Sequence, residues 1–195
     1  AEDATVVAGV AGANGSVARV VKSATAELWD GTTVSTGANQ SIATIPFTAT
    51  ARSMTLRVRA PAAGIVVRLK VEDAADNTHT VETEATTTVA NAWETLTFNF
   101  ANQATGTAAL NLAFTYNKAS VFFAFGTTGA AGGAGTYYFD ELNFVAGGGG
   151  GGGGGTVAGL PIDFDTAGVT YTLTGFGGAE DATVVAGVAG ANGSV

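Results

Sequence analysis

Hydrophobic and polar residues alternate along most of this chain with a period of two. In the segment MTLRVRA at residues 54–60, Leu56 and Val58 fall on one side and Arg57 and Arg59 on the other. Thr, Val, Phe and Tyr dominate such segments, and turn residues interrupt them about every eight to twelve positions. This pattern is typical of β-strands in an antiparallel sandwich or barrel.

The alternation predicts about ten strands. They are expected at residues 17–22, 42–47, 54–60, 65–71, 80–86, 93–100, 121–125, 137–145, 162–165 and 169–174. Such a number suits two packed antiparallel sheets, so the predicted fold class is an all-β, antiparallel two-sheet sandwich.

The segment PAAG at residues 61–64 carries turn residues, which predicts a hairpin of the strands 54–60 and 65–71. With the strand 80–86 beside it, this hairpin would present six charged side chains on one sheet face. These are Arg57, Arg59, Arg68, Lys70, Glu82 and Glu84. Because acids and bases are neighbours in this arrangement, we expect cross-strand ion pairs rather than a basic surface for an anionic polysaccharide.

An exact repeat organises the chain. Residues 1–17, AEDATVVAGVAGANGSV, recur letter for letter at 179–195, and nine consecutive glycines run from Gly147 to Gly155. A run of glycine buries no side chain and is a linker by composition. We therefore expect most of one module at 1–145, a linker at 146–159, opening strands at 160–178 and the second copy at 179–195.

Three arrangements fit this repeat. The chain is a window on a tandem array of modules, a circular permutant joined by glycines, or a duplication in which two copies compete for one slot. We take the array as the main interpretation. In each case the folding unit is completed across the chain ends, with the opening strands beside the body of the module.

Composition narrows the possible functions. The chain has 195 residues, eight Lys plus Arg, and a formal net charge of −8, which argues against nucleic acid as a partner. The absence of Cys excludes disulfides and zinc–thiolate sites, and a single His leaves no cluster of imidazole ligands for a transition metal. Glu82 and Glu84 lie two apart on one strand, with no sign of a groove for glycoside hydrolysis. We therefore expect no enzymatic activity. The apolar stretches are short and interrupted, so we also expect no membrane insertion.

Three motifs carry a resemblance to a known family. They are LPIDFD at 160–165, AWETLTFNF at 92–100 and GTYYFDELNFV at 135–145. In the order that begins at Leu160 and continues from Ala1 to Val145, the chain resembles the jelly-roll, galactose-binding-like carbohydrate-binding modules of secreted bacterial proteins. The resemblance implies a jelly roll whose first and last strands lie side by side. It also implies an extracellular or cell-surface location, structural calcium in many members and a glycan site on the concave sheet in some.

The resemblance points to Asp140 and Asp165 as calcium ligands, because they fall on the family positions that most often supply them. Calcium takes six to eight oxygen ligands, so neighbouring acids would have to contribute. The alternative is that these residues are solvated acids at sheet edges, where charge discourages pairing with other sheets.

Glycan binding requires exposed aromatic faces that stack on sugar rings, together with polar groups that fix orientation. Trp29 lies before Asp30–Gly31 at the junction of a strand and a turn, where exposure is expected. Trp93 is out of phase with Leu96 and would face outward. Either residue could instead be a packing residue of the core or its rim.

The main functional interpretation is a non-catalytic structural module of an extracellular tandem-repeat fibre or adhesin. Its partners would be neighbouring copies of the module, joined by strand pairing. Ala4 and Val6, with their counterparts Ala182 and Val184, mark the predicted assembly strand. The alternative is a monomeric carbohydrate-binding module, permuted or repeated, whose partner is a polysaccharide.

Overall fold

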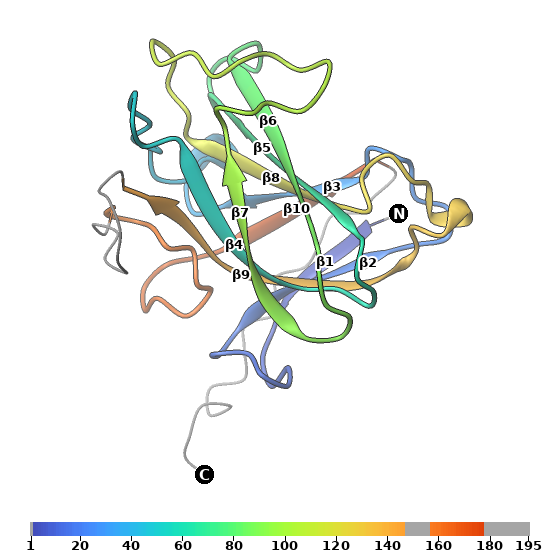
Figure 1. The fold of residues 1–195 in the computed structure, drawn as a ribbon. Helices are drawn as coiled ribbons and strands as arrows, with labels where there is room; N and C mark the ends of the chain where they lie inside the picture. Colours follow the sequence, from blue (N-terminus) through green and yellow to red (C-terminus); the bar gives the residue numbers. More distant parts are fainter. Residues whose placement is uncertain (1, 147–156, 178–195) are drawn as a thin grey trace.

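A computed structural model describes residues 2–146 and 157–177. Ten strands form two five-stranded antiparallel sheets that pack face to face (Figure 1). Sheet A has the order β1 (Glu2–Val7), β2 (Val17–Lys22), β9 (Gly135–Val145), β4 (Ser53–Arg59) and β7 (Trp93–Asn99). Sheet B has the order β10 (Thr172–Phe176), β3 (Gly31–Ser35), β8 (Lys118–Phe123), β5 (Val66–Glu72) and β6 (Thr80–Thr86). The predicted all-β two-sheet sandwich is confirmed.

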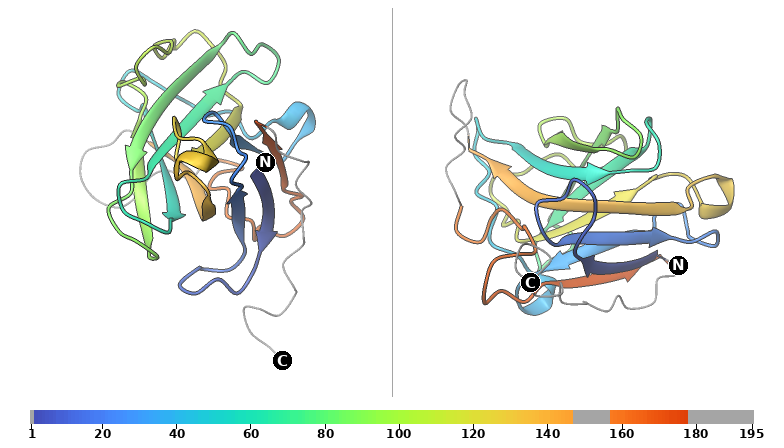
Figure 2. Two further views of the ribbon diagram at one scale, coloured as in Figure 1. Left: turned by 90° about the vertical axis from the view of Figure 1, so that its right-hand side faces the viewer. Right: turned by 90° about the horizontal axis from the view of Figure 1, so that it is seen from below.

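The connectivity is that of a jelly roll. Eight strands interleave as β2-β9-β4-β7 in sheet A and β3-β8-β5-β6 in sheet B. The remaining two extend the same edge of the sandwich, since β1 pairs with β2 and β10 pairs with β3. Figure 2 shows β1 and β10 side by side, with the end of β10 close to the start of β1. Residues 160–177 thus complete the sandwich built by residues 2–146.

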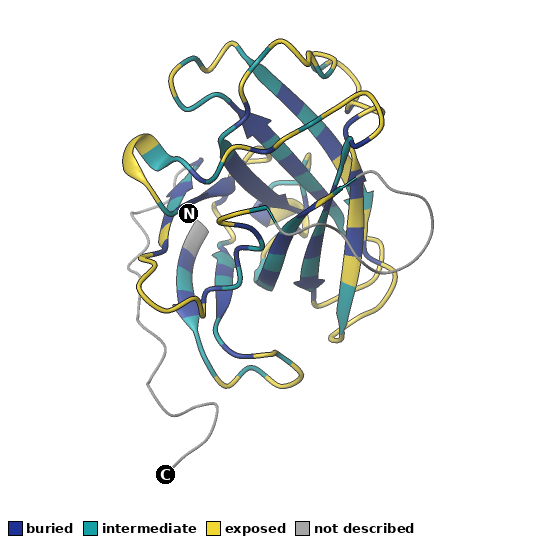
Figure 3. Cartoon of the chain, turned by 90° about the vertical axis from the view of Figure 1, so that its left-hand side faces the viewer, coloured by how far each residue is buried: buried dark blue, intermediate teal, exposed yellow. Residues whose placement is uncertain are grey.

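The core lies between the sheets, where alternate residues of most strands are buried (Figure 3). Met54, Leu56 and Val58 of β4 and Val67, Leu69 and Val71 of β5 are fully buried. The C-terminal segment adds Leu160, Ile162, Phe164, Tyr171 and Leu173 to the same cluster. Because burial of apolar side chains stabilises the fold, this segment is an integral part of the core.

The predicted hairpin of residues 54–60 and 65–71 is wrong. Strand β4 pairs with β7 and β9, whereas β5 pairs with β6 and β8, so residues 61–64 carry the chain from one sheet to the other. Alternation shows which residues of a strand face the core. It does not show which strand pairs with which, because both sheets bury one face and a strand has the same pattern in either sheet. Arg57 and Arg59 therefore lie on sheet A, apart from the charged residues of β5 and β6 on sheet B.

Two predicted strands are largely loop. Residues 42–47 bury Ile42 and Ile45 but make only single main-chain hydrogen bonds to the segment that precedes β8. Residues 162–165 form one isolated bridge, between Ile162 and Leu142. In contrast, β3 was missed by the sequence prediction because all five of its residues are buried and it shows no alternation. Two short 3-10 turns, η1 (Ala38–Gln40) and η2 (Gly129–Ala131), complete the secondary structure of the described residues.

A β-bulge interrupts β9 where it pairs with β4. Thr55 lies opposite Asn143 and Arg57 opposite Asp140, so β9 carries one extra residue at this point. Glu141 has a φ of 51°, in the left-handed region, and the buried phase changes from Tyr137 and Phe139 to Leu142 and Phe144. Bulges re-aim side chains, and this one brings the side chains of Asp140 and Glu141 to the same arginine.

Candidate functional site

The outer face of sheet B holds an open pocket of about 460 Å³. Its floor is formed by outward side chains of β5, β8 and β10, whose neighbours Leu69, Val121 and Leu173 point into the core. We call it the sheet B pocket. Its lining includes Trp29, Thr33, Gln40, Arg68, Lys70, Glu72, Glu82, Thr107, Lys118, Ser120, Phe122, Phe125, Thr174 and Phe176.

Aromatic side chains form part of this lining. Trp29 is 49% exposed and stacks on Phe176, with ring centroids 6.5 Å apart and an interplanar angle of 17°. Phe122 packs edge-on against Phe176 at 5.4 Å and against Phe125 at 5.6 Å. A Cβ on Gly31 would overlap both Phe122 and Phe176, so glycine at the start of β3 makes room for this packing. The result is a supported indole face that remains open to solvent.

Paired charges form the polar floor of the pocket. Arg68 contacts Glu82 at 2.8 Å and Glu84 at 2.5 Å, and its guanidinium lies 3.5 Å from the centre of the Phe125 ring. The predicted cross-strand ion pairs of β5 and β6 are therefore confirmed.

Glu72 occupies the other part of this floor, between two lysines. Burial alone would raise its pKa, but hydrogen bonds from Lys70 and Lys118 outweigh that effect and the pKa of Glu72 is lowered. The acids and bases of the floor neutralise one another, which favours a ligand with hydroxyl groups over a strongly charged one.

A second pocket, of about 480 Å³, is lined by residues of the C-terminal segment, among them Asp163, Thr166 and Tyr171. Asp163 accepts hydrogen bonds from the Tyr171 hydroxyl and from the main chain and side chain of Thr166. Although burial alone would raise the pKa of Asp163, these hydrogen bonds lower it. The carboxylate is thus already occupied in stabilising its own loop.

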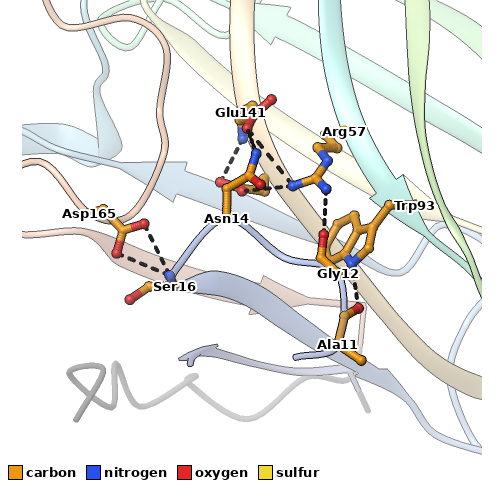
Figure 4. Close-up of polar contacts among 9 residues, drawn as sticks. Ala11, Gly12, Asn14, Ser16, Arg57, Trp93, Glu141 and Asp165 are labelled. Carbon is orange, nitrogen blue, oxygen red and sulfur yellow. Dashed lines mark hydrogen bonds and ion pairs between the residues drawn. The ribbon is translucent and has the colours of Figure 1, made fainter. Parts of the chain in front are cut away.

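The two predicted calcium ligands take part in a contact network with the loop that follows β1, and Figure 4 shows its members Asp165, Arg57 and Glu141. Asp165 accepts hydrogen bonds from the Ser16 main-chain N–H at 3.0 and 3.1 Å. Arg57 Nη1 lies 3.9 Å from Asp140 Oδ2 and 3.9 Å from Glu141 Oε1. Glu141 also accepts a hydrogen bond of 2.8 Å from the Asn14 side chain.

Asp140 is the unusual acid of this network. Its side chain is 2% exposed, and burial above all raises its pKa to about 7 from an ordinary 3.8. The main-chain N–H of Glu141 donates to Asp140 and Arg57 attracts its charge, and both effects lower the pKa. The charges of Glu141 and Asp165 act in the opposite direction.

The described residues do not fit a calcium site well. Calcium requires six to eight oxygens, whereas no group of three or more His, Asp or Glu side chains suited to a metal is present in residues 2–146 and 157–177. Both oxygens of Asp165 are engaged by Ser16, and the positive charge near Asp140 comes from Arg57. Calcium binding at Asp140 and Asp165 stays a prediction.

Trp93, the second predicted glycan contact, takes part in the same network. Its Nε1 donates to the Ala11 carbonyl at 3.1 Å, and the Arg57 guanidinium lies 4.8 Å from the centre of its ring. A Cβ on Gly12 would come within 3.0 Å of the indole. The ring is thus covered by Arg57 and the loop after β1, while Trp29 is left as the open aromatic face. The structure does not test whether either residue contacts a glycan.

The predicted assembly strand is only partly described. Ala4 and Val6 belong to β1, pair with Val20 and Ala18 of β2, and are 0% and 3% exposed. Ala182 and Val184 lie outside the described residues, as do the glycines of the predicted linker. No helix long and apolar enough to cross a membrane occurs among the residues that the structure describes.

Sequence reasoning expected Glu141 near Asp140 and Asp165 but missed Arg57 and Asn14 as members of the contact network. One signal was present: in YYFDELNFV the apolar residues change phase between Phe139 and Leu142. Such a change predicts a bulge, and bulges accompany sites. The partner residues on the loop after β1 carry no comparable signal.

No family model matches the chain, and no curated protein matches it. Among solved structures it is similar to the crystal structure of a family 30 carbohydrate-binding module, with a TM-score of 0.49 and 8% identity. The alignment covers 81% of this chain and 81% of that one.

Proposed function

We propose that this chain is a non-catalytic carbohydrate-binding module of a secreted or cell-surface protein, and that its glycan binds in the sheet B pocket. The supporting observation is the supported, half-exposed indole of Trp29 at a pocket with a polar floor. An indole face attracts the C–H side of a sugar ring, and the neighbouring hydroxyl, amide and charged groups can bind the ring hydroxyls.

The pocket suits a neutral glycan. Its three basic side chains Arg68, Lys70 and Lys118 are each paired with an acid, so none offers a free charge to a uronate or sulfate. Thr33 and Ser120, which share a hydrogen bond of 2.7 Å, add hydroxyl groups to the same lining. We therefore expect binding that changes little with salt.

The test is calorimetric titration of the full chain with a panel of neutral and acidic oligosaccharides. Trp29→Ala should weaken binding of the best neutral ligand about tenfold or more, since stacking of this kind is worth about 1 kcal/mol beyond area burial. Trp93→Phe is the matched control and should bind as the parent does. Because the chain has two Trp, the control also leaves Trp29 as the sole indole, whose fluorescence should respond to the glycan.

Equal affinity of the Trp29→Ala and parent chains would contradict a glycan site in this pocket. Loss of binding in Trp93→Phe alone would move the site to the contact network around Arg57.

A second candidate is a structural role in a tandem array, fibre or adhesin, with neighbouring modules as partners. The observation that favours it is the exact recurrence of residues 1–17, together with the adjacency of β1 and β10 at one edge of the sandwich. Electron micrographs of an expressed multi-repeat chain test it: filaments with a constant axial rise near one module length support this role, and dispersed single particles contradict it.

A further inference from the structure

The first copy of the repeated segment occupies a defined site on the sandwich. Strand β1 pairs with β2 from Glu2 opposite Lys22 to Val7 opposite Val17, and it buries Ala4 and Val6. We call the outer edge of β2, together with the side chains of Arg57, Trp93, Glu141 and Asp165, the segment site.

The segment site recognises this sequence through few groups. Arg57 donates to the Gly12 carbonyl at 2.6 Å, Trp93 donates to the Ala11 carbonyl, and Asp165 accepts from the Ser16 N–H (Figure 4). Among the polar contacts of the described residues, the hydrogen bond of Glu141 with Asn14 reaches a side chain of the segment. The second copy repeats each of these positions, as Ala189, Gly190, Asn192 and Ser194. The chemistry of the site therefore does not distinguish the two copies.

The second copy follows β10 closely in the sequence, and β10 ends near the start of the first copy. Strand β10 ends at Phe176, and Figure 2 shows that end beside the start of β1. Only Gly177 and Gly178 separate Phe176 from Ala179, the first residue of the second copy. A tether of this length gives an effective concentration in the millimolar range. The first copy is tethered as well, through its direct connection to β2.

We propose that the segment site is a binding site for the peptide strand AEDATVVAGVAGANGS from either position, and that residues 179–194 of the chain replace residues 1–16 in it, while Val17 stays in β2. The two occupants make the same contacts, so their balance is set by the tethers and is changed by a single substitution in one copy. The proposed exchange does not depend on glycan binding. A structural role in a tandem array would use the same segment site.

Matched substitutions in the two copies test the proposal by thermal unfolding of the full chain. Val6→Asp prevents the first copy from packing in the segment site, and Val184→Asp does the same for the second copy. The double variant carries both substitutions. We expect each single variant to unfold within about 3 °C of the parent, and the double variant about 10 °C or more lower, because a buried, unpaired carboxylate then has no substitute strand. If Val6→Asp alone unfolds as low as the double variant, the second copy does not enter the site and the proposal is wrong.

Added peptide provides the second measurement. The peptide AEDATVVAGVAGANGS should raise the Tm of the double variant, whereas the same peptide with Asp at its sixth position should not. If the double variant does not fold, hydrogen exchange of Val6→Asp gives the answer: the amides of 182–185 should gain the protection that those of 4–7 have in the parent chain. Unprotected amides at 182–185 would overturn the proposal.

Sedimentation of Val6→Asp identifies the donor. We expect a monomer at micromolar concentration, because the tethered copy outcompetes one supplied by another molecule. An oligomer whose population rises with concentration would overturn the intramolecular replacement.

Discussion

Two arginines with the same place in the alternating pattern have different tasks in the folded chain. Arg68 on sheet B lies between two carboxylates at 2.8 and 2.5 Å, on strands that pair directly. Arg57 on sheet A lies 3.9 Å from two carboxylates, and its short hydrogen bond goes to the main-chain carbonyl of Gly12. The comparison shows that Arg68 balances charge on a surface, whereas Arg57 fixes a distant segment of chain.

The largest difference should appear when each arginine is truncated. Arg57→Ala should lower the free energy of unfolding by about 2–3 kcal/mol, because it removes a hydrogen bond and leaves buried Asp140 without its counter-charge. Arg68→Ala should cost less, about 1 kcal/mol, because its partners Glu82 and Glu84 keep 19% and 37% of their side-chain surface in contact with water and can be hydrated once the arginine is gone. Urea denaturation at pH 7 measures both, and equal losses would refute the distinction.

A smaller effect is expected from Asp140→Asn, and its sign depends on pH. The pKa of Asp140 is raised in the folded chain to about 7, so folding favours the protonated acid. The stability that this gives is complete below about pH 4 and is lost as pH rises through 7. Asp140→Asn should flatten that fall and be more stable than the parent by about 1–2 kcal/mol at pH 8. Parallel pH profiles of the two chains would contradict this account.

Trp93→Phe should have a still smaller effect. The substitution keeps most of the aromatic contact with Arg57 but removes the hydrogen bond to Ala11, so we expect a loss of about 1 kcal/mol. Trp29→Phe is the control, since no hydrogen bond of the Trp29 indole holds a loop in the described residues, and urea denaturation should place it near the parent. A control as destabilised as Trp93→Phe would show that the hydrogen bond to Ala11 is not what matters.

The smallest effect is expected from calcium. Arg57 supplies positive charge beside Asp140, and Asp165 is engaged by Ser16, so a chelator should leave the Tm unchanged. A Tm that rises with millimolar calcium, and falls again with chelator, would support Asp140 and Asp165 as ligands after all.

The sequence predicted the sandwich and most strands. Each of these strands buries one face, so apolar and polar residues alternate along its sequence with a period of two. It could not assign strand partners, since β4 and β5 show equal patterns yet belong to different sheets. Strand β3 was not predicted, because all five of its residues are buried and its sequence shows no alternation. At the candidate sites, the exposure of Trp29 and the ion pairs of Arg68 follow from local sequence. The contacts of Arg57 depend on a bulge and a remote loop.

The nearness of the end of β10 to the start of β1 has a further consequence. A chain whose two outermost strands meet at one edge is nearly a ring, and a ring can be cut in more than one place without separating residues that touch. A protein engineer could join Gly177 to Glu2 through a few residues and open the chain near residue 150 instead. The rearranged polypeptide should reach the same sandwich, because closing so short a connection costs little entropy.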